Sequence, residues 1–343
     1  MGNLKPLTDD FGRQITYLRI SVTDRCNLRC VYCMPESGIS LLNHNEVISY
    51  EDILRLTGIL SKHGVNKIRI TGGEPLVRKG LTCLIENMSR IKGIEDISMT
   101  TNGILLEKYA SELYNAGLKR INISLDSLKE ERFWKITRMG SLKDVLTGIK
   151  LAKKTGFKPV KINTVLIRGI NDDEIIDFVN FAKEFELNLR FIEYMPIGGN
   201  IAEAVLSKEI EEKIRSEFDD FSLMTGNQAE NNAYNADVHS GVSRSFGFKD
   251  GKAVIGFISP LSEHFCGNCN RLRLTASGNL RPCLFYDNEY NIKDILKEND
   301  DEAVFEKVSG IIKLKRFKHN FNDKAEKKES LLWANDFMNG IGG

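Results

Sequence analysis

Six of the seven cysteines in this chain of 343 residues fall into two groups of three, far apart in the sequence. The first group consists of Cys26, Cys30 and Cys33, and the second group consists of Cys266, Cys269 and Cys283. Thiolates are soft ligands that bind iron–sulfur clusters, zinc or Cu(I). A cubane [4Fe–4S] cluster normally takes four cysteines, so three thiols on one loop would leave one iron open to a small chelating molecule. The two groups therefore indicate metal chemistry at two places.

The composition narrows the class of protein in which this chemistry occurs. The 48 Lys and Arg residues against 47 Asp and Glu residues give a net charge of +1, which argues against nucleic acid or a membrane surface as a partner. No apolar run approaches the roughly 18 residues of a membrane span, and residues 1–13 contain no apolar segment of a secretory signal. We therefore expect a cytoplasmic protein, in which an odd number of reduced thiols argues against a disulfide scaffold.

The elements that must position the thiols alternate regularly over the first two thirds of the chain. Strand, helix, strand at this interval predicts repeated βα units and a parallel sheet. Six strands are too few for a closed eight-unit barrel, so the prediction is an α/β fold with an incomplete (βα)6 TIM-type barrel. The first strand leads directly into Cys26, at the carboxyl end where parallel βα proteins place their sites. The predicted strands are 15–22, 67–71, 97–101, 120–125, 160–167 and 189–193, and the predicted helices begin after Ser49 and span 81–91, 105–116, 142–155 and 173–185.

The pattern changes after about residue 197, which divides the chain into a barrel at 1–197, an unassigned connection at 198–256 and a smaller α+β domain at 257–343. A helix is predicted at 207–218 and a loop at 225–244. The C-terminal part has predicted strands at 251–259, 271–275 and 280–285 and predicted helices at 291–298 and 301–314. We interpret the basic stretch 313–328 as a solvated face, and Cys83 as a buried apolar residue.

The first cysteine group and the residues that end the second predicted strand together resemble the motifs of a known superfamily. The spacing C-x3-C-x2-C with Tyr32 before the last cysteine, together with Thr71-Gly72-Gly73-Glu74-Pro75, resembles the radical S-adenosylmethionine (radical SAM) superfamily. The resemblance implies a partial (βα)6 barrel and a [4Fe–4S] cluster on Cys26, Cys30 and Cys33 whose open iron chelates S-adenosylmethionine. It further implies that S-adenosylmethionine is held by Tyr32, Gly73, Ser124 and Met195.

The second cysteine group is open to two interpretations. His264 could complete a structural Cys3His zinc site, or the three thiols could hold a second cluster whose open iron faces a substrate. Arg271 and Arg273 alternate in a predicted strand and therefore point to the same face. Because guanidinium forks bind phosphate in a bidentate manner, the pair predicts a local anion pocket in a protein of nearly zero net charge.

A second resemblance joins these features. Residues 18–25, the segment from Ser259 to Leu284 and the terminal Gly342-Gly343 pair are similar to the GTP 3′,8-cyclase family of molybdenum cofactor biosynthesis. This resemblance implies a second [4Fe–4S] cluster on Cys266, Cys269 and Cys283, and a catalytic diglycine tail of Gly342 and Gly343. The GTP contacts that it implies are Arg19, Arg69, Thr100, Lys161, Arg271 and Arg273, and it adds Lys67 and Arg190 as further candidates.

The implied reaction is a radical cyclisation by a lyase. A 5′-deoxyadenosyl radical would remove the hydrogen at ribose C3′ of GTP, and the carbon radical would add to guanine C8. The cofactor supplies the difficult step, while the protein supplies position and charge. The same resemblance implies cyclic pyranopterin monophosphate synthase as acceptor of the product and an unidentified electron donor, and it leaves a homodimer open.

Two other functions remain at this point. A radical enzyme acting on a peptide would use the second thiol group as an auxiliary redox cluster, but it would not explain Arg271, Arg273 and the diglycine end. A non-catalytic electron carrier or zinc-held binding module would make the Gly72-Gly73-Glu74-Pro75 match accidental. Cleavage of S-adenosylmethionine separates the enzymes from the third possibility, and the identity of the altered substrate separates the two enzymes.

Overall fold

A computed structural model of the chain describes residues 5–195, 203–224, 244–263, 265–285 and 288–318. Six consecutive parallel strands form its centre, and each pairs with the next in sequence order. They are β1 (Tyr17–Ser21), β2 (Lys67–Thr71), β3 (Asp96–Thr101), β4 (Arg120–Ser124), β5 (Val160–Leu166) and β6 (Asn188–Glu193). The predicted incomplete (βα)6 barrel is therefore confirmed, and every predicted barrel strand overlaps an observed one.

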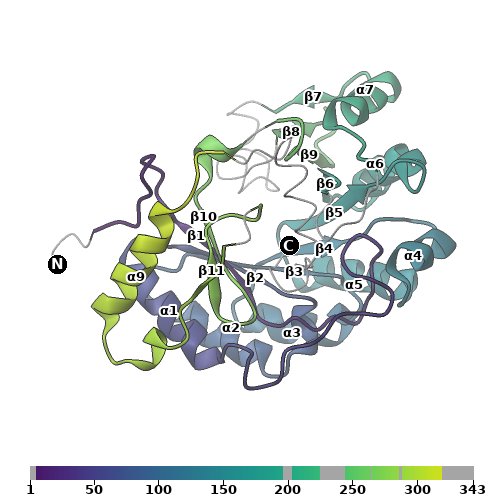
Figure 1. Ribbon diagram of the computed structural model, residues 1–343. Coiled ribbons are helices and arrows are strands. Elements are labelled where there is room, and N and C mark those ends of the chain that lie inside the picture. The colour runs from purple at the N-terminus through teal and green to yellow at the C-terminus, as the bar shows by residue number, and fades with distance from the viewer. Residues whose placement is uncertain (1–4, 196–202, 225–243, 264, 286–287, 319–343) are drawn as a thin grey trace.

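Helices cover the outer face of this curved sheet (Figure 1). The Ser49 side chain caps the first helix by accepting a hydrogen bond of 3.0 Å from the backbone N–H of Asp52, as its sequence predicts. The fifth helix ends at Gly156, whose φ of 103° suits a residue without a side chain. The helices of this part are α1 (Tyr50–Lys62), α2 (Leu81–Ser89), α3 (Leu106–Asn115), α4 (Glu130–Thr137), α5 (Leu142–Thr155) and α6 (Ile175–Glu184), with short 3₁₀ turns at Pro75–Val77 and Asp172–Glu174.

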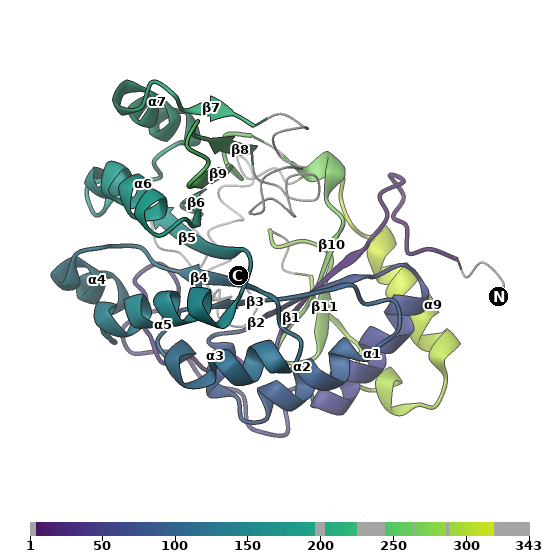
Figure 2. The same cartoon turned by 180° about the vertical axis from the view of Figure 1, so that it is seen from behind.

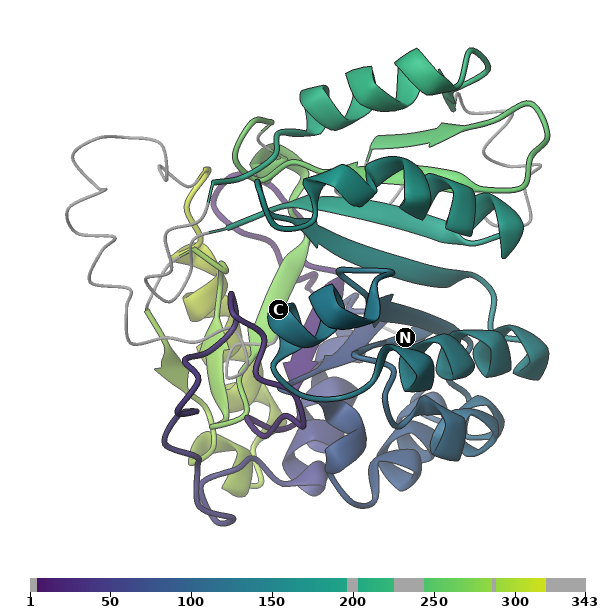
Figure 3. The ribbon, with the colours of Figure 1, turned by 90° about the vertical axis from the view of Figure 1, so that its right-hand side faces the viewer.

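The C-terminal part extends the sheet at both edges. On one side β9 (Val254–Ile258) pairs in parallel with β6 and is followed outward by β8 (Arg244–Gly247) and β7 (Ser222–Leu223). Helix α7 (Ser207–Glu217) packs beside α6 over this edge, as the teal and green helices in Figure 3 show.

On the other side, β10 (Arg271–Leu274) pairs in parallel with β1 and continues into an antiparallel β11 (Asn279–Arg281) and β12 (Tyr290–Asn291). Helix α9 (Asp301–Lys313) returns to pack against α1, which Figures 1 and 2 both show. The ring of His63, at the end of α1, stacks on Phe305 of α9 with centroids 3.7 Å apart.

One predicted element is absent, and one observed helix was not predicted. The helix expected at 291–298 is absent because Asn291 pairs with Asn279 in the sheet, and only a 3₁₀ turn, Ile295–Lys297, follows. Helix α4 was not expected, since its two turns bury only Phe133, Ile136 and Thr137 and so give little periodic signal. Within the described part of the chain, none of the helices is long and apolar enough to cross a membrane.

The two faces of the central sheet differ in chemistry. Leu18 and Ile20 of β1 belong to one continuous apolar core together with residues of the helices. The alternate residue, Arg19, points to the opposite face, inside the barrel, because successive strand side chains alternate. This polar inner face is where a ligand could be bound.

Candidate active site

The first cysteine group lies on the loop that leaves the carboxyl end of β1. Cys26, Cys30 and Cys33 are half-buried, and the backbone N–H of Cys33 donates to the carbonyl of Cys30 at 2.9 Å, which closes a tight turn. Burial raises the pKa of Cys30, and Cys33, Asp126 and Cys26 raise it further, so the thiols are close enough to affect one another. Burial also raises the pKa of Cys26 to about 11. Iron binding must therefore displace thiol protons.

The two glycines after β2 lie against the start of this loop. Gly73 donates its N–H to the carbonyl of Thr23 at 2.7 Å, and Glu74 donates to the carbonyl of Arg25 at 2.8 Å. A Cβ atom on Gly73 would lie 2.3 Å from the carbonyl oxygen of Arg25, and one on Gly72 would lie 2.7 Å from that of Thr23. The resemblance described above implies that Gly73 holds S-adenosylmethionine. The structure adds a close approach to the cysteine loop itself.

Substitution of Gly73 by alanine should therefore displace the cysteine loop. We expect Gly73→Ala to lower the free energy of unfolding of the iron-free protein by about 1–3 kcal/mol, the usual cost of overpacking, and to lower iron incorporation. Chemical denaturation and iron analysis measure the two effects. Gly58→Ala is the matched control, because Gly58 lies within α1 and an added Cβ would meet no atom within 4 Å. Equal behaviour of the two variants would contradict the prediction.

Glu74 connects three parts of this end of the barrel. Its buried carboxylate accepts hydrogen bonds from the backbone N–H of Asn102 (2.7 Å), the hydroxyl of Thr101 (2.8 Å) and the N–H of Leu76 (3.0 Å). The side-chain amide of Asn102 lies 3.9 Å from the sulfur of Cys26. Glu74 thus holds the end of β3 in place beside the cysteine loop.

Burial raises the pKa of Glu74 to about 7, although its three hydrogen bonds oppose this. A carboxyl whose pKa is raised on folding favours the folded state when protonated, so this contribution is present below about pH 4 and is lost as the pH rises to about 7. We expect the free energy of unfolding of the iron-free protein to fall over this range. In urea denaturation, Glu74→Gln should flatten the dependence of the free energy of unfolding on pH. An unchanged pH dependence in this variant would contradict the raised pKa of Glu74.

Tyr32 and Asp126 connect the cysteine loop to the ends of β4 and β5. The Tyr32 hydroxyl donates to Asp126 at 2.5 Å, and Asp126 also accepts from the backbone N–H of Val165 at 2.8 Å. Burial raises the pKa of Asp126 to about 6. Ser124 ends β4 two residues earlier, while Met195 follows β6 by two residues. The four residues predicted to hold S-adenosylmethionine thus lie on, or at the carboxyl ends of, elements around one rim of the barrel.

Arginines fill the middle of the barrel's inner face. Arg19 of β1 is in register with Arg273 of β10 on one side and with Arg69 of β2 on the other. Residues in register on neighbouring strands point to the same face of the sheet. A second inward row, one strand further round, consists of Thr100, Asn122 and Lys161. The structure therefore brings together Arg19, Arg69, Arg273, Thr100 and Lys161, which lie in five separate segments of the sequence.

These cations affect one another strongly. Burial lowers the pKa of Arg19, and the neighbouring charges of Arg273, Arg69 and Arg271 lower it further. Burial and Arg271 also lower the pKa of Arg273 to about 10. Guanidinium groups remain charged at neutral pH, so the inner face concentrates positive charge in a region of low dielectric constant. Such a region favours a polyanionic ligand.

The second cysteine group lies at the other end of the same strands. Cys266 begins a 3₁₀ turn, Cys266–Asn268, and the backbone of Asn270 accepts hydrogen bonds of 3.2 Å from Thr16 and Tyr17, just at the amino end of β1. Cys266 and Cys269 directly precede β10, whose amino end lies beside the amino end of β1 because the two strands are parallel, whereas Cys26 follows the carboxyl end of β1. The arginine row therefore lies between the two thiol groups.

The third thiol of this group returns through the β10–β11 hairpin. Cys283 follows the end of β11 by two residues, and it is close enough to Arg273 of β10 for its charge to affect that guanidinium. Burial would raise the pKa of Cys269, but Arg271 and Lys315 together lower it to about 6, which favours a thiolate. Among the described residues no three His, Cys, Asp or Glu side chains converge on one shared metal ion. A cubane instead needs one thiolate at each of three irons, so these donors fit it.

Other predicted residues have different outcomes. His264, Gly342 and Gly343 lie outside the described residues. Cys83 is exposed on α2, so its prediction as a buried residue is wrong. The sequence also missed Glu74 and Asp126 as organisers of the loop; the position of Asp126 just after a strand end was the available signal.

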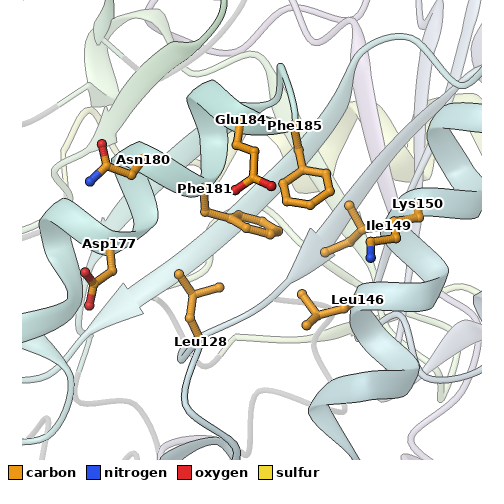
Figure 4. Close-up of a pocket in the computed structure, with 9 residues that line it drawn as sticks. All are labelled: Leu128, Leu146, Ile149, Lys150, Asp177, Asn180, Phe181, Glu184 and Phe185. Carbon is orange, nitrogen blue, oxygen red and sulfur yellow. The ribbon is translucent and has the colours of Figure 1, made fainter.

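A cavity of about 390 Å³ lies elsewhere, between α5 and α6 outside the sheet (Figure 4). Leu146, Ile149, Phe181 and Phe185 give it apolar walls, and Lys150 and Glu184 lie at its polar side. No predicted site residue lines it. The candidate active site is therefore the inner face of the barrel rather than this cavity.

The fold and the two thiol loops define a partial (βα)6-barrel protein with a cationic interior. Residues 20–182 match the radical SAM superfamily, and residues 187–321 match the Molybdenum Cofactor Synthesis C family. In solved structures, the chain resembles SuiB of Streptococcus suis bound to S-adenosylmethionine, with a TM-score of 0.63, 16% identity and coverage of 88% of this chain and 69% of that one. It also resembles anSMEcpe with bound AdoMet, with a TM-score of 0.56, 19% identity and coverage of 91% and 82%. At these identities the likeness concerns the fold alone.

Two relatives are much closer in sequence. A GTP 3′,8-cyclase of Thermodesulfovibrio yellowstonii is 50% identical over 314 residues, which are 90% of this chain and 94% of the relative. A GTP 3′,8-cyclase of Petrotoga mobilis is 45% identical over 324 residues, or 94% and 98% of the two chains. The chain belongs to the GTP 3′,8-cyclase family of the radical SAM superfamily. The superfamily is defined by a [4Fe–4S] cluster and S-adenosylmethionine, as the sequence predicted.

Proposed function

We propose that the protein converts GTP to (8S)-3′,8-cyclo-7,8-dihydroguanosine 5′-triphosphate, the first step of molybdenum cofactor biosynthesis. One observation carries the proposal: Arg273, Arg19 and Arg69 form an inward row between two three-cysteine groups. Three guanidinium groups on one face supply charge and paired donors for a triphosphate. The cyclase relatives, at 45–50% identity over nearly their whole length, support the same substrate.

The first thiol group would hold a [4Fe–4S] cluster through Cys26, Cys30 and Cys33. When bound, this cluster and S-adenosylmethionine supply a 5′-deoxyadenosyl radical for hydrogen removal at ribose C3′. The chain's own part is to position S-adenosylmethionine, with backbone atoms at Gly73 and Tyr32 and with Ser124 and Met195. Glu74 and Asp126 keep this rim in place through the hydrogen bonds described above.

The second thiol group would hold another [4Fe–4S] cluster and lie beside the guanine. Arg271, at the start of β10, is placed between that group and the arginine row. Thr100 and Lys161 face the same space from β3 and β5 and would orient the nucleotide. Fixing both ends of GTP limits the positions that ribose C3′ and guanine C8 can take, which favours intramolecular attack. Gly342 and Gly343 remain proposed catalytic residues.

Two alternatives are weaker on particular observations. SuiB, one of whose structures is bound to the precursor peptide SuiA, shares only 18% identity with this chain, and a peptide substrate gives the arginine row no role. Structural zinc at the second cysteine group would need a fourth ligand. The positive charges of Arg271 and Lys315 near Cys269 instead favour a metal centre of net negative charge. The proposed product acceptor is cyclic pyranopterin monophosphate synthase.

The test is anaerobic purification and reconstitution, followed by iron and sulfide analysis and incubation with dithionite, S-adenosylmethionine and GTP. We expect about eight irons per chain, four for each cubane, with formation of 5′-deoxyadenosine and a cyclised GTP product identified by mass spectrometry. Zinc at the second site, or 5′-deoxyadenosine without any change in GTP, would contradict the proposal.

A further inference from the structure

Lys315 is a buried lysine in a stretch that the sequence predicted to face solvent. Only 4% of its surface is exposed, and its ammonium donates to the backbone carbonyls of Arg271 (3.0 Å) and Pro282 (2.5 Å). Lysine is rarely buried unless its charge has a specific partner. Here both hydrogen-bond acceptors are neutral carbonyls, and within the described ranges no carboxylate forms an ion pair with Lys315. The position therefore keeps a positive charge inside the protein.

The two carbonyls belong to the segments that carry two thiols of the second group. Arg271 follows Cys269 by two residues, and Pro282 directly precedes Cys283. One ammonium thus bridges both strands of the hairpin at the end where the thiols lie. The ammonium therefore lies beside the backbone that leads directly to Cys269 and Cys283.

Arg13 connects residues 316 and 317, which follow Lys315, to the turn that carries Cys266. Its guanidinium donates to the carbonyl of Cys266 at 2.7 Å and to the carbonyls of Arg316 (2.8 Å) and Phe317 (3.0 Å). Asp9 binds its Nε at 2.6 Å and offsets the charge of Arg13. Lys315 and Arg13 therefore bind backbone carbonyls that lie at, or within two residues of, each of the three cysteines.

We propose that Lys315 is a positioning residue of the second cluster site, which holds the Cys269 and Cys283 segments together and raises the reduction potential of the group bound there. The inference rests on the proposed second [4Fe–4S] cluster. Three thiolates give such a cluster a net negative charge that grows on reduction. A nearby buried cation stabilises the reduced form more than the oxidised form, because net charge and surroundings set cluster potentials.

The test uses the full-length chain with Cys26, Cys30 and Cys33 changed to alanine, so that bound iron reports the second site alone. In this parent we compare Lys315→Met with Lys315→Arg and with Lys313→Met, which removes the same charge from an exposed position at the end of α9. Iron analysis and potentiometric titration followed by electron paramagnetic resonance are the measurements. We expect Lys315→Met to lower the reduction equilibrium constant at least tenfold, which is about 59 mV for one electron, while the other two variants stay near the parent.

The outcomes separate the two proposals. A parent that folds, by circular dichroism, but binds no iron overturns the second cluster and with it the role of Lys315. A parent with about four irons and a Lys315→Met potential equal to its own overturns the role of Lys315 alone, as does a Lys315→Arg potential as low as that of Lys315→Met. Loss of iron in folded Lys315→Met, with retention in Lys315→Arg, supports the positioning role.

Discussion

Replacing Cys30 by alanine is expected to reduce cleavage of S-adenosylmethionine to the rate measured without protein. Cys30 lies at the centre of the first thiol group, where its thiol is influenced by both Cys33 and Cys26. The two remaining thiolates would leave a second iron without a protein ligand, so the cluster would not be retained. Formation of 5′-deoxyadenosine, followed by chromatography, measures the loss, and iron should fall by about four per chain.

Cys83→Ala is the matched control for this substitution. Cys83 is an exposed thiol on α2 that belongs to neither group, and its sulfur accepts a hydrogen bond from Asn87 at 3.4 Å. This variant should retain full iron content and the same rate of cleavage. Comparable losses in both variants would indicate general damage from removing a thiol, and full activity of Cys30→Ala would exclude the first group as the cluster site.

The second large effect is expected for the double variant Arg271→Ala with Arg273→Ala. Each guanidinium can form charge-assisted hydrogen bonds worth about 1.5–3 kcal/mol, so losing both should weaken GTP binding by at least about 100-fold. Arg273 is the member of the buried row next to Arg19, and Arg271 lies nearer the second thiol group. Calorimetry under anaerobic conditions measures the dissociation constant, and both clusters should remain.

Arg90→Ala provides the comparison for general loss of positive charge. Arg90 is exposed at the end of α2 and pairs with Glu86 of the same helix at 2.5 Å, outside the barrel. We expect unchanged GTP affinity for this variant. If the double variant also binds GTP normally while its iron content is intact, Arg271 and Arg273 do not line the nucleotide site. The GTP affinity of Arg273→Lys should lie between that of the unchanged protein and that of the double variant, because lysine keeps the charge and loses the planar fork.

Local sequence pattern was sufficient for the central fold. Apolar residues alternate in the short strands, as Leu18 and Ile20 do on either side of Arg19, and they recur at helical spacing after Ser49. These patterns follow from one requirement, that each element buries one face. The prediction failed where this signal is weak or where a distant partner competes: the segment after Tyr290 has helical spacing, yet Asn291 pairs with Asn279 in the sheet.

The sequence by itself determined the chemistry, because three closely spaced thiols and a Gly-Gly-Glu strand end depend on residue type and local spacing. The tertiary structure alone decided how these parts face one another. Strand β10 lies parallel to β1, although the paired residues Arg19 and Arg273 are 254 positions apart in the sequence, and this pairing sets the two thiol groups at opposite ends of one arginine row. It also buries Lys315, whose neighbours in sequence are exposed. Long-range strand pairing and burial depend on the whole folded chain, so no local pattern could reveal them.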